Sequence, residues 1–472
     1  PIGGIDDPEN WPRYDLIWPH LSGSNAADCD QEDTRRLLID RVRYLWKRGE
    51  YEEALEVGAE WEAQWREKIG PDHRQTLHLR FQIANVLRSQ GRYREAYQTD
   101  EEILDKQQRS LGGNHPLVLQ TAGSLAADLR SLGKFGEALA MDERNYRELR
   151  DTVGPDEPNT LSAGNNLAVD LRLMGNFARA RDLDAEMLAD RHRVLGPDHP
   201  YTLHSAAMLG RDMRELGEYA NSVDLIRATL ERYGAILGED LVDTLRTAKS
   251  LAVSLRKMGR LAEALQLSGQ TSERYASSYS PNLPEAVACR LNLACDLFAR
   301  DDMTAAYETA SEVLRSYEDA LGAEHPFTLA ARNNVATYLR GTGSVRTALD
   351  LTGRTLAALR ATLGDEHPHT LTCAVNQANC LHDLGRLAEA EAELRDAHER
   401  LAKTLGRRHP DTLLCQANLA VATWASGRNE DAVRLQQLVV AEMREVLGEE
   451  HPSIAALRDW RVQSRDLEVQ PT

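Results

Sequence analysis

A glycine recurs every 42 residues along almost the whole chain, and this period constrains the fold more than any other feature. The run 195–203, Leu-Gly-Pro-Asp-His-Pro-Tyr-Thr-Leu, contains one of these glycines and returns with small changes in most repeats. The set comprises Gly70, Gly112, Gly154, Gly196, Gly238, Gly322, Gly364, Gly406 and Gly448. The one gap, from 238 to 322, is twice 42, and Ser280 stands at the missing position. A fixed period of roughly 20 to 50 residues is typical of a solenoid.

A second set of glycines keeps the same step and divides each repeat into two halves. It comprises Gly49, Gly91, Gly133, Gly175, Gly217, Gly259, Gly343, Gly385 and Gly427, with Asp301 as the exception. Apolar residues recur at helical spacing within each half, as in Leu167 and Leu171 before a break and Phe177 and Ala180 after it. Glycine just past a helix supplies a left-handed cap, and the Pro-x-Thr of the loop suits the start of the next helix. Each repeat is therefore predicted to be a helical hairpin.

The repeated unit resembles the long tetratricopeptide repeat of the kinesin-light-chain type. The resemblance rests on Leu-Gly-x-x-His-Pro-x-Thr-Leu, on Asn-Asn-Leu-Ala at 165–168 and on Gly-x-Phe/Tyr-x-x-Ala at 175–180, and it covers roughly residues 34–465. It implies an all-α fold, a right-handed α-solenoid of about ten tetratricopeptide-type helical hairpins plus a C-terminal capping helix. The hairpins are expected at 34–69, 76–111, 118–153, 160–195, 202–237, 244–279, 286–321, 328–363, 370–405 and 412–447.

Three regions follow from this pattern: an acidic, Trp-rich linker or N-terminal cap at 1–33, the solenoid at 34–453, and a C-terminal capping helix and tail at 454–472. The charged residues Arg465, Asp466 and Glu468 favour a solvent-facing final helix near 454–468. The array is irregular at 279–303, where two glycines are missing. This stretch is expected to be a change of pitch, a hinge, or drift in a tolerant loop.

The region before the repeats carries a second resemblance. The run Asn10-Trp11-Pro12-Arg13-Tyr14, with Trp18-Pro19-His20 after it, resembles the segment that joins the ATPase to the repeats in actinobacterial NB-ARC/tetratricopeptide (STAND-type) proteins, including members linked to FxSxx-COOH modified-peptide systems. It implies that an NB-ARC ATPase module precedes these repeats in a longer polypeptide, and the initial Pro in place of Met also suggests a fragment. The alternative is an aromatic N-terminal cap of a free-standing solenoid.

Composition argues against several classes of function. The net charge of −18 disfavours binding to nucleic acid or to a membrane surface, both of which attract basic proteins. No run approaches the ~18 apolar residues of a membrane span, and no signal peptide is recognisable. The six cysteines are scattered without a Cys-x-x-Cys pair, which favours reduced thiols and a cytoplasmic protein. Half of the 14 histidines belong to the periodic loop, so neither a metal nor another cofactor is expected.

Catalytic motifs are missing from the sequence. We find no phosphate loop, no Gly-x-Ser-x-Gly and no His-Glu-x-x-His. The abundant carboxylates are periodic and stand at the starts of second helices, where they favour the helix dipole. This chain is therefore not expected to be an enzyme, although a longer parent protein would be an ATPase if the resemblance at residues 10–20 holds.

Binding in the concave groove of the solenoid is the remaining option. The residue three positions before each turn glycine should face this groove, and arginine dominates the column: Trp46, Arg88, Arg130, Arg172, Arg214, Arg256, Phe298, Arg340, His382 and Trp424. Its guanidinium groups could pair with the carboxylates or phosphates of a partner. Nine positions before the glycine stands a column of amides: Asn166, Asn292, Asn334, Asn376 and Asn418. These could bond the backbone of a bound peptide, as the kinesin-light-chain resemblance also implies. Both columns could equally be scaffold, with arginine paired to a neighbouring carboxylate.

The leading hypothesis is a ligand-sensing, autoinhibitory repeat domain of an NB-ARC ATPase switch. Its partner would be a protein or peptide, acidic or C-terminal, bound in the concave groove. The first alternative is a constitutive scaffold or adaptor without switching. The second is nucleic-acid binding through the arginine column, which the net charge opposes.

Overall fold

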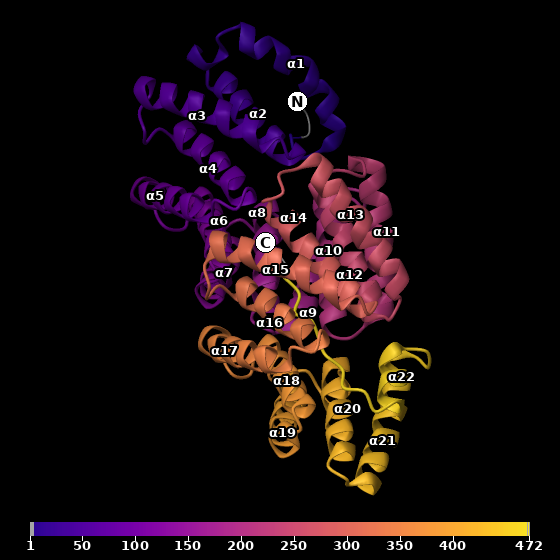
Figure 1. Ribbon diagram of the computed structural model, residues 1–472. Coiled ribbons are helices and arrows are strands. Elements are labelled where there is room, and N and C mark those ends of the chain that lie inside the picture. Colours follow the sequence, from indigo (N-terminus) through magenta and orange to yellow (C-terminus); the bar gives the residue numbers. More distant parts are fainter. Residues whose placement is uncertain (1–3, 470, 472) are drawn as a thin grey trace.

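The protein is an array of helical hairpins wound into a superhelix (Figure 1). The computed structural model describes residues 4–469 and 471. Within these residues there are 22 α-helices and two short 3-10 helices, and no β-strand. The predicted all-α solenoid is confirmed.

Ten consecutive hairpins follow the first helix, α1 (Trp11–Gly23). They are α2 (Glu32–Arg48) with α3 (Tyr51–Lys68), α4 (Arg74–Ser89) with α5 (Tyr93–Leu111), α6 (Pro116–Ser131) with α7 (Phe135–Thr152), α8 (Pro158–Leu173) with α9 (Phe177–Leu195), α10 (Pro200–Glu215) with α11 (Tyr219–Leu237), α12 (Val242–Lys257) with α13 (Leu261–Ser278), α14 (Pro284–Ala299) with α15 (Met303–Leu321), α16 (Pro326–Gly341) with α17 (Val345–Leu363), α18 (Pro368–Asp383) with α19 (Leu387–Thr404), and α20 (Pro410–Ala425) with α21 (Asn429–Leu447). A short helix, α22 (Pro452–Arg458), follows the last hairpin.

The repeated loop motif ends one helix and starts the next through backbone and histidine hydrogen bonds. At the start of α10, His199 Nδ1 accepts a hydrogen bond from the backbone N–H of Tyr201, and Pro200 occupies the first turn. At its end, Gly217 has φ +82° and its N–H bonds the carbonyl of Arg214. Glycine reaches this left-handed region without the penalty that a β-carbon brings. The periodic Gly, His and Pro residues are thus the boundaries of the hairpins.

Successive turns of the superhelix contact each other at a constant sequence separation of 194 positions. Histidines of the later loops reach back to the ends of earlier helices through Nε2: His325 to the carbonyl of Ser131 at 3.2 Å, His367 to Leu173 at 2.9 Å, His409 to Glu215 at 2.8 Å and His451 to Lys257 at 3.1 Å. A separation of 194 positions corresponds to more than four and fewer than five of the 42-residue repeats. One superhelical turn therefore takes between four and five hairpins. The loop motif therefore serves both the hairpin and the packing of one turn on the next.

This packing explains why some turn glycines tolerate no side chain. A β-carbon on Gly217 would lie 2.5 Å from Pro410 Cδ, and one on Gly175 would lie 2.6 Å from Pro368 Cδ. Gly427 and Gly385 belong to the last turn, and a β-carbon there would meet nothing within 4 Å. Glycine is therefore required at Gly217 and Gly175 both for the positive φ and for lack of space, and at Gly427 and Gly385 for the positive φ alone.

We expect Gly217→Ala to destabilise the protein far more than Gly427→Ala. Both substitutions place alanine at nearly the same positive φ, which costs about 1–2 kcal/mol. Only Gly217→Ala also forces a methyl group into the proline of the next turn, which adds about 1–3 kcal/mol. Denaturant unfolding followed by circular dichroism measures both. Equal losses in the two variants would contradict the close packing of turns.

The irregular stretch at 279–303 continues the array of hairpins. Asp301 takes the place of the turn glycine at φ +71°, and the side chain of Asp302 caps α15 by accepting from the N–H of Ala305. Aspartate enters the left-handed region more readily than most residues, so the turn is kept without glycine. Whether the stretch acts as a hinge stays a prediction.

Aromatic side chains close the N-terminal end of the solenoid. Tyr14 and Trp18 of α1 are buried and stack at 5.1 Å, and Trp11 meets Tyr44 of α2 edge to face at 5.7 Å. The hydroxyl of Tyr44 donates to Asp15 at 2.5 Å. Residues 10–20 therefore form an aromatic cap on the first hairpin, whatever precedes them in a longer polypeptide.

The C-terminal end differs from the sequence prediction. The predicted solvent-facing helix near 454–468 is wrong, because α22 ends at Arg458 and Trp460 turns the chain with φ +55°. From there the chain runs without regular structure into the interior of the superhelix, the yellow segment that passes α20 towards α16 (Figure 1). The charged residues Arg465, Asp466 and Glu468 lie within the solenoid and not in solvent.

Candidate functional site

The concave surface of the second half of the solenoid is occupied by the chain's own C-terminal segment. We call residues 461–469 the tail, and we call the surface that it covers the groove, lined by α10, α12, α16, α18 and α20. Leu467 and Val469 of the tail are only 3% and 1% exposed. The tail therefore lies where a partner of a solenoid would bind.

The asparagine column binds the backbone of the tail. Asn418 donates to the carbonyl of Gln463 at 2.7 Å and accepts from its N–H at 2.8 Å. Asn376 does the same with Arg465 at 2.8 and 3.2 Å, and Asn334 with Leu467 at 2.8 and 2.7 Å.

Three consecutive repeats thus hold every second residue of an extended strand. Each amide pairs with both backbone polar groups of one tail residue and with no side chain of the tail, so these contacts carry no sequence preference.

The arginine column has a scaffold role in the first half of the chain. Arg88, Arg130 and Arg172 each pair with an aspartate on the second helix of the same hairpin and with another on the first helix of the next hairpin. The N···O distances are 2.8 and 2.7 Å for Arg88 with Asp100 and Asp128, 2.7 and 3.2 Å for Arg130 with Asp142 and Asp170, and 2.7 and 2.5 Å for Arg172 with Asp184 and Asp212. Each arginine thereby joins its own hairpin to the next one.

The pattern of carboxylates changes in the second half, where the tail lies. The positions equivalent to the two aspartates hold Ile226 and Ser254 for Arg214, and Ser268 and Asp296 for Arg256. Arg214 pairs with its neighbour Glu215 at 3.2 Å and with Glu468 of the tail at 2.9 Å.

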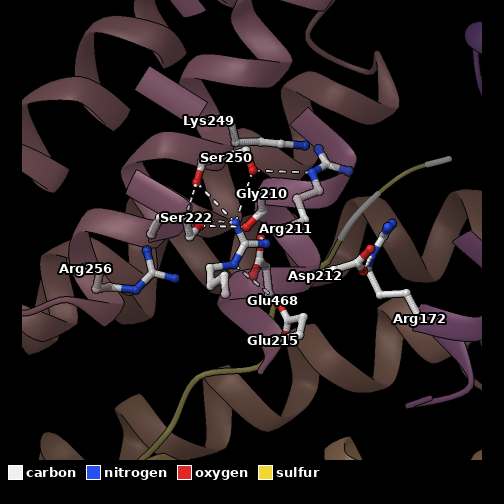
Figure 2. Close-up of polar contacts among 12 residues, drawn as sticks. Arg172, Gly210, Arg211, Asp212, Glu215, Ser222, Lys249, Ser250, Arg256 and Glu468 are labelled. Carbon is white, nitrogen blue, oxygen red and sulfur yellow. Dashed lines mark hydrogen bonds and ion pairs between the residues drawn. The ribbon is translucent and has the colours of Figure 1, made fainter. Parts of the chain in front are cut away.

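Arg256 pairs with Asp296 at 2.8 Å and with Asp466 of the tail at 2.9 Å. Figure 2 shows the surroundings of Glu468, including Ser250, to which Arg214 also donates at 3.1 Å. The tail therefore supplies the second carboxylate that the sequence of the repeats lacks here.

Electrostatics favours the charged form of the tail. Burial alone would raise the pKa of Asp466, but Arg256, Lys257 and Arg465 outweigh burial and hold it well below the usual range. Asp411 of α20 behaves in the same way: burial opposes its charge, and Arg465, at 2.8 Å, with His409 lowers its pKa to about 2. Both carboxylates are therefore anionic over the physiological range.

The other residues of the two columns lie in different surroundings. Arg340 donates to Ser464 of the tail at 3.0 Å and to Asp383 at 2.7 Å. Phe298 packs on Tyr338, with ring centroids 4.8 Å apart, and His382 bonds Asp383. Trp46 donates through its indole nitrogen to Ser89 at 2.7 Å. Trp424 is 37% exposed and stacks at 4.4 Å on Trp460, where the chain turns from α22 towards the tail.

Two asparagines of the column do not contact the tail. Asn292 is buried one repeat beyond Asn334, and its amide nitrogen has no hydrogen-bond partner among the residues that the structure describes. Asn166 lines a cavity of about 1030 Å³ between the first helices of the N-terminal hairpins, with Asn85, Gln82 and His78. The concave surface thus continues past the tail into a hollow with a polar wall.

Two further groups hold the tail: Asn379, whose departure from the repeat consensus makes it a candidate for specificity in the sequence, and Asp411, which sequence reasoning missed. Asn379 donates to the carbonyl of Gln463 at 2.9 Å, and Asp411 pairs with Arg465. Arg211 and Lys249 also depart from the repeat consensus: Lys249 is buried beside Glu285 at 2.5 Å, and burial lowers the pKa of Arg211 to about 10. The missing aspartates after Arg214 and Arg256 were the available signal, since they leave these cations with fewer carboxylates than Arg172 has.

Within residues 4–469 and 471, no group of three or more His, Cys, Asp or Glu side chains could hold a metal ion. No helix in the same residues is both long and apolar enough to cross a membrane. What the groove presents is hydrogen bonding and charge for an extended chain.

Comparisons with known proteins agree with this architecture. Residues 33–99, 78–147, 209–277 and 373–441 match one tetratricopeptide-repeat family model, and residues 160–201, 287–327 and 328–369 match a second. The comparison with curated proteins finds no match.

Solved structures that are similar to this chain include the following three. One is a putative kinesin light chain from Podosopora anserina with nearly identical TPR-like repeats, 29% identical over 43% of this chain and 95% of that chain, with a TM-score of 0.33. BtubC (BKLC) from P. vanneervenii is 14% identical over 52% of this chain and 92% of that chain, with a TM-score of 0.36. A Rap protein complexed with competence and sporulation factor is 12% identical over 78% of this chain and 99% of that chain, with a TM-score of 0.51, which reflects a shared fold.

The family matches cover most of the sequence, and they fall on the ten hairpins described above. The chain belongs to the tetratricopeptide-repeat family.

Proposed function

We propose that this chain is a protein-binding repeat module whose groove takes an extended peptide. The observation that supports it is the pairing of Asn334, Asn376 and Asn418 with both backbone groups of alternate tail residues. An amide that satisfies one N–H and one C=O of a strand recognises any extended peptide in the same register. The arginine column adds a preference for carboxylates at the intervening positions.

The finer proposal is a sensor in a switch. If an NB-ARC ATPase precedes these repeats, as the resemblance at residues 10–20 implies, ligand in the groove would shift the position of the repeats against the ATPase and relieve autoinhibition. Such a shift requires that the ligand bind the two states with different affinity. A phosphate-loop sequence in the coding region upstream would support this proposal, and a start codon directly before residue 1 would contradict it.

Hydrogen exchange of the tail tests recognition through the backbone. We expect the N–H groups of Gln463, Arg465 and Leu467 to exchange slowly, because each donates to an asparagine, and those of Ser464 and Glu468 to exchange faster. Mass spectrometry with single-residue fragmentation resolves the alternation. Uniformly fast exchange along 461–469 would contradict the proposal.

A matched pair of variants assigns the protection to the asparagine column. Asn334→Ala should speed exchange of the N–H of Leu467 by at least tenfold while leaving the array intact. Asn159→Ala, in the cavity away from the tail, should leave the same N–H protected.

A further inference from the structure

We infer that the tail is a built-in competitor for the groove, and that the ligand it excludes is an extended peptide with two carboxylates spaced two residues apart and aliphatic residues between and after them. This inference rests on the proposed function and adds the ligand class and its regulation. The sequence Asp466-Leu467-Glu468-Val469 is the template for that class.

Alternate side chains of the tail contact two different walls of the groove, one lined by arginines and the other apolar. The carboxylates of Asp466 and Glu468 meet Arg256 and Arg214, each at 2.9 Å. Leu467 and Val469 belong to the apolar cluster that contains Leu291. Since successive side chains of an extended strand point to opposite faces, one register satisfies both walls at once.

The arginines of the groove need carboxylates that the repeats do not supply. Arg172, with scaffold partners only, has two buried aspartates, whereas Arg214 and Arg256 each have one scaffold carboxylate and one from the tail. If a neutral peptide displaced the tail, Arg214 and Arg256 would each lose one of their two carboxylate partners. Leaving a buried cation with fewer anionic partners is unfavourable. The ligand that replaces the tail must therefore be acidic at the same two positions.

The tail is tethered but is not part of the hairpins. It is joined to α22 through residues 459 and 460, so it competes from within the same molecule at an effective concentration in the millimolar range. A longer ligand would reach groups beyond the tail, namely Asn292 and the polar hollow lined by Asn166. Those additional contacts give an external peptide the means to displace the tail.

The test uses the full chain and a fluorescein-labelled synthetic peptide with the sequence of residues 461–469. Asp466→Lys/Glu468→Lys places cations against Arg256 and Arg214 and should expel the tail. Asp459→Lys/Glu450→Lys makes the same change of charge at exposed positions. We expect fluorescence anisotropy to show binding to the tail variant about 100-fold tighter than to the parent or the control variant.

Each other result has a defined meaning. Equally tight binding to the parent, the control and the tail variant would overturn the tail as a competitor and would leave peptide binding in place. Equal affinity for a peptide with Asn and Gln in place of its two carboxylates would overturn the acidic ligand class. Absence of binding to a tail variant with parental circular dichroism would overturn this inference, while the exchange pattern of the parent separately decides recognition through the backbone.

Two further measurements test where the peptide binds and whether the tail in the groove belongs to the same molecule. Asn334→Ala/Asn376→Ala in the tail-variant background should abolish binding of the peptide, and retained binding would place the peptide outside the groove. Sedimentation should give a monomer for both parent and tail variant. A parent dimer that the tail substitutions dissociate would show that the tail of a second copy occupies the groove, and would overturn competition within one molecule.

Discussion

Replacing Arg172 with leucine is expected to lower the free energy of unfolding by about 3–5 kcal/mol, the cost of removing one partner from a buried ionic group. The guanidinium lies 2.7 Å from Asp184 and 2.5 Å from Asp212, and both carboxylates are fully buried. Without the arginine, the two anions would face each other without the guanidinium that pairs with both. Denaturant unfolding followed by circular dichroism measures the loss.

Two comparisons make the result specific. Arg340→Leu removes an arginine of the same column whose partner Asp383 is 27% exposed, so we expect a loss of about 1 kcal/mol or less. Combining Arg172→Leu with Asp184→Leu and Asp212→Leu removes the charges together, and most of the stability should return. A loss for Arg172→Leu no larger than that for Arg340→Leu would show that these pairs do not hold the hairpins together.

The pH dependence of the Arg172→Leu effect has a definite sign. Burial, and then the facing Asp212, raise the pKa of Asp184 in the parent, while Arg172 opposes them. Removing Arg172 therefore raises the pKa of Asp184 further. A carboxyl with a raised pKa in the folded state favours folding at low pH and opposes it as the pH rises through that pKa. The difference between variant and parent should therefore shrink as the pH is lowered.

The hairpins could be predicted from the sequence because their determinants are local. A glycine after a helix, a proline in its first turn and apolar residues at helical spacing specify each unit without knowledge of its neighbours. The amides of Asn334, Asn376 and Asn418 share one phase of the repeat, so the sequence could mark them as candidates for bonding a peptide backbone, with a scaffold role left open. The occupant of the groove carries no repeat, and so periodicity could not reveal it.

The tail and the packing of superhelical turns depend on contacts between distant residues. The sequence separation between touching turns is set by how tightly the hairpins wind, and no single repeat encodes that angle. Asp466 and Glu468 were predicted to be surface residues because charged side chains are usually solvated. Only the contrast between Asp184, which pairs with Arg172, and Ile226, at the equivalent position after Arg214, could have shown that the second half lacks carboxylates.

Acidification is expected to loosen the contact between superhelical turns. His367 accepts a hydrogen bond at Nδ1 from the N–H of His369 at 3.1 Å and donates through Nε2 to the carbonyl of Leu173 at 2.9 Å. Protonation of Nδ1 removes the first bond and places a charge in the buried contact between turns. Burial lowers the pKa of His367 to about 4, and the same holds for His325 and His451.

The sign of this effect follows from the lowered pKa. An unfolded histidine binds its proton near pH 6.5, whereas the folded one stays neutral until about pH 4. The unfolded state therefore binds more protons between these values, and the stability present above pH 6.5 is lost as the pH falls towards 4. At pH 5 the loss is on the order of 2 kcal/mol for each such histidine.

Comparing two histidine variants separates this effect from other titrations. His367→Asn keeps a side chain that can cap α18 but loses the bond to Leu173, so it should cost about 1 kcal/mol at neutral pH. That cost should vanish or reverse near pH 5, because holding the buried ring neutral there costs the parent more than the bond contributes. His115 caps α6 in the same way at 3.2 Å but makes no bond to an earlier turn among the residues that the structure describes, so His115→Asn should cost less than His367→Asn at neutral pH. If His367→Asn costs no more than His115→Asn at neutral pH, the histidines act only within their own loops, and the turns must be held by the contacts of Pro368 and Pro410 against the glycines.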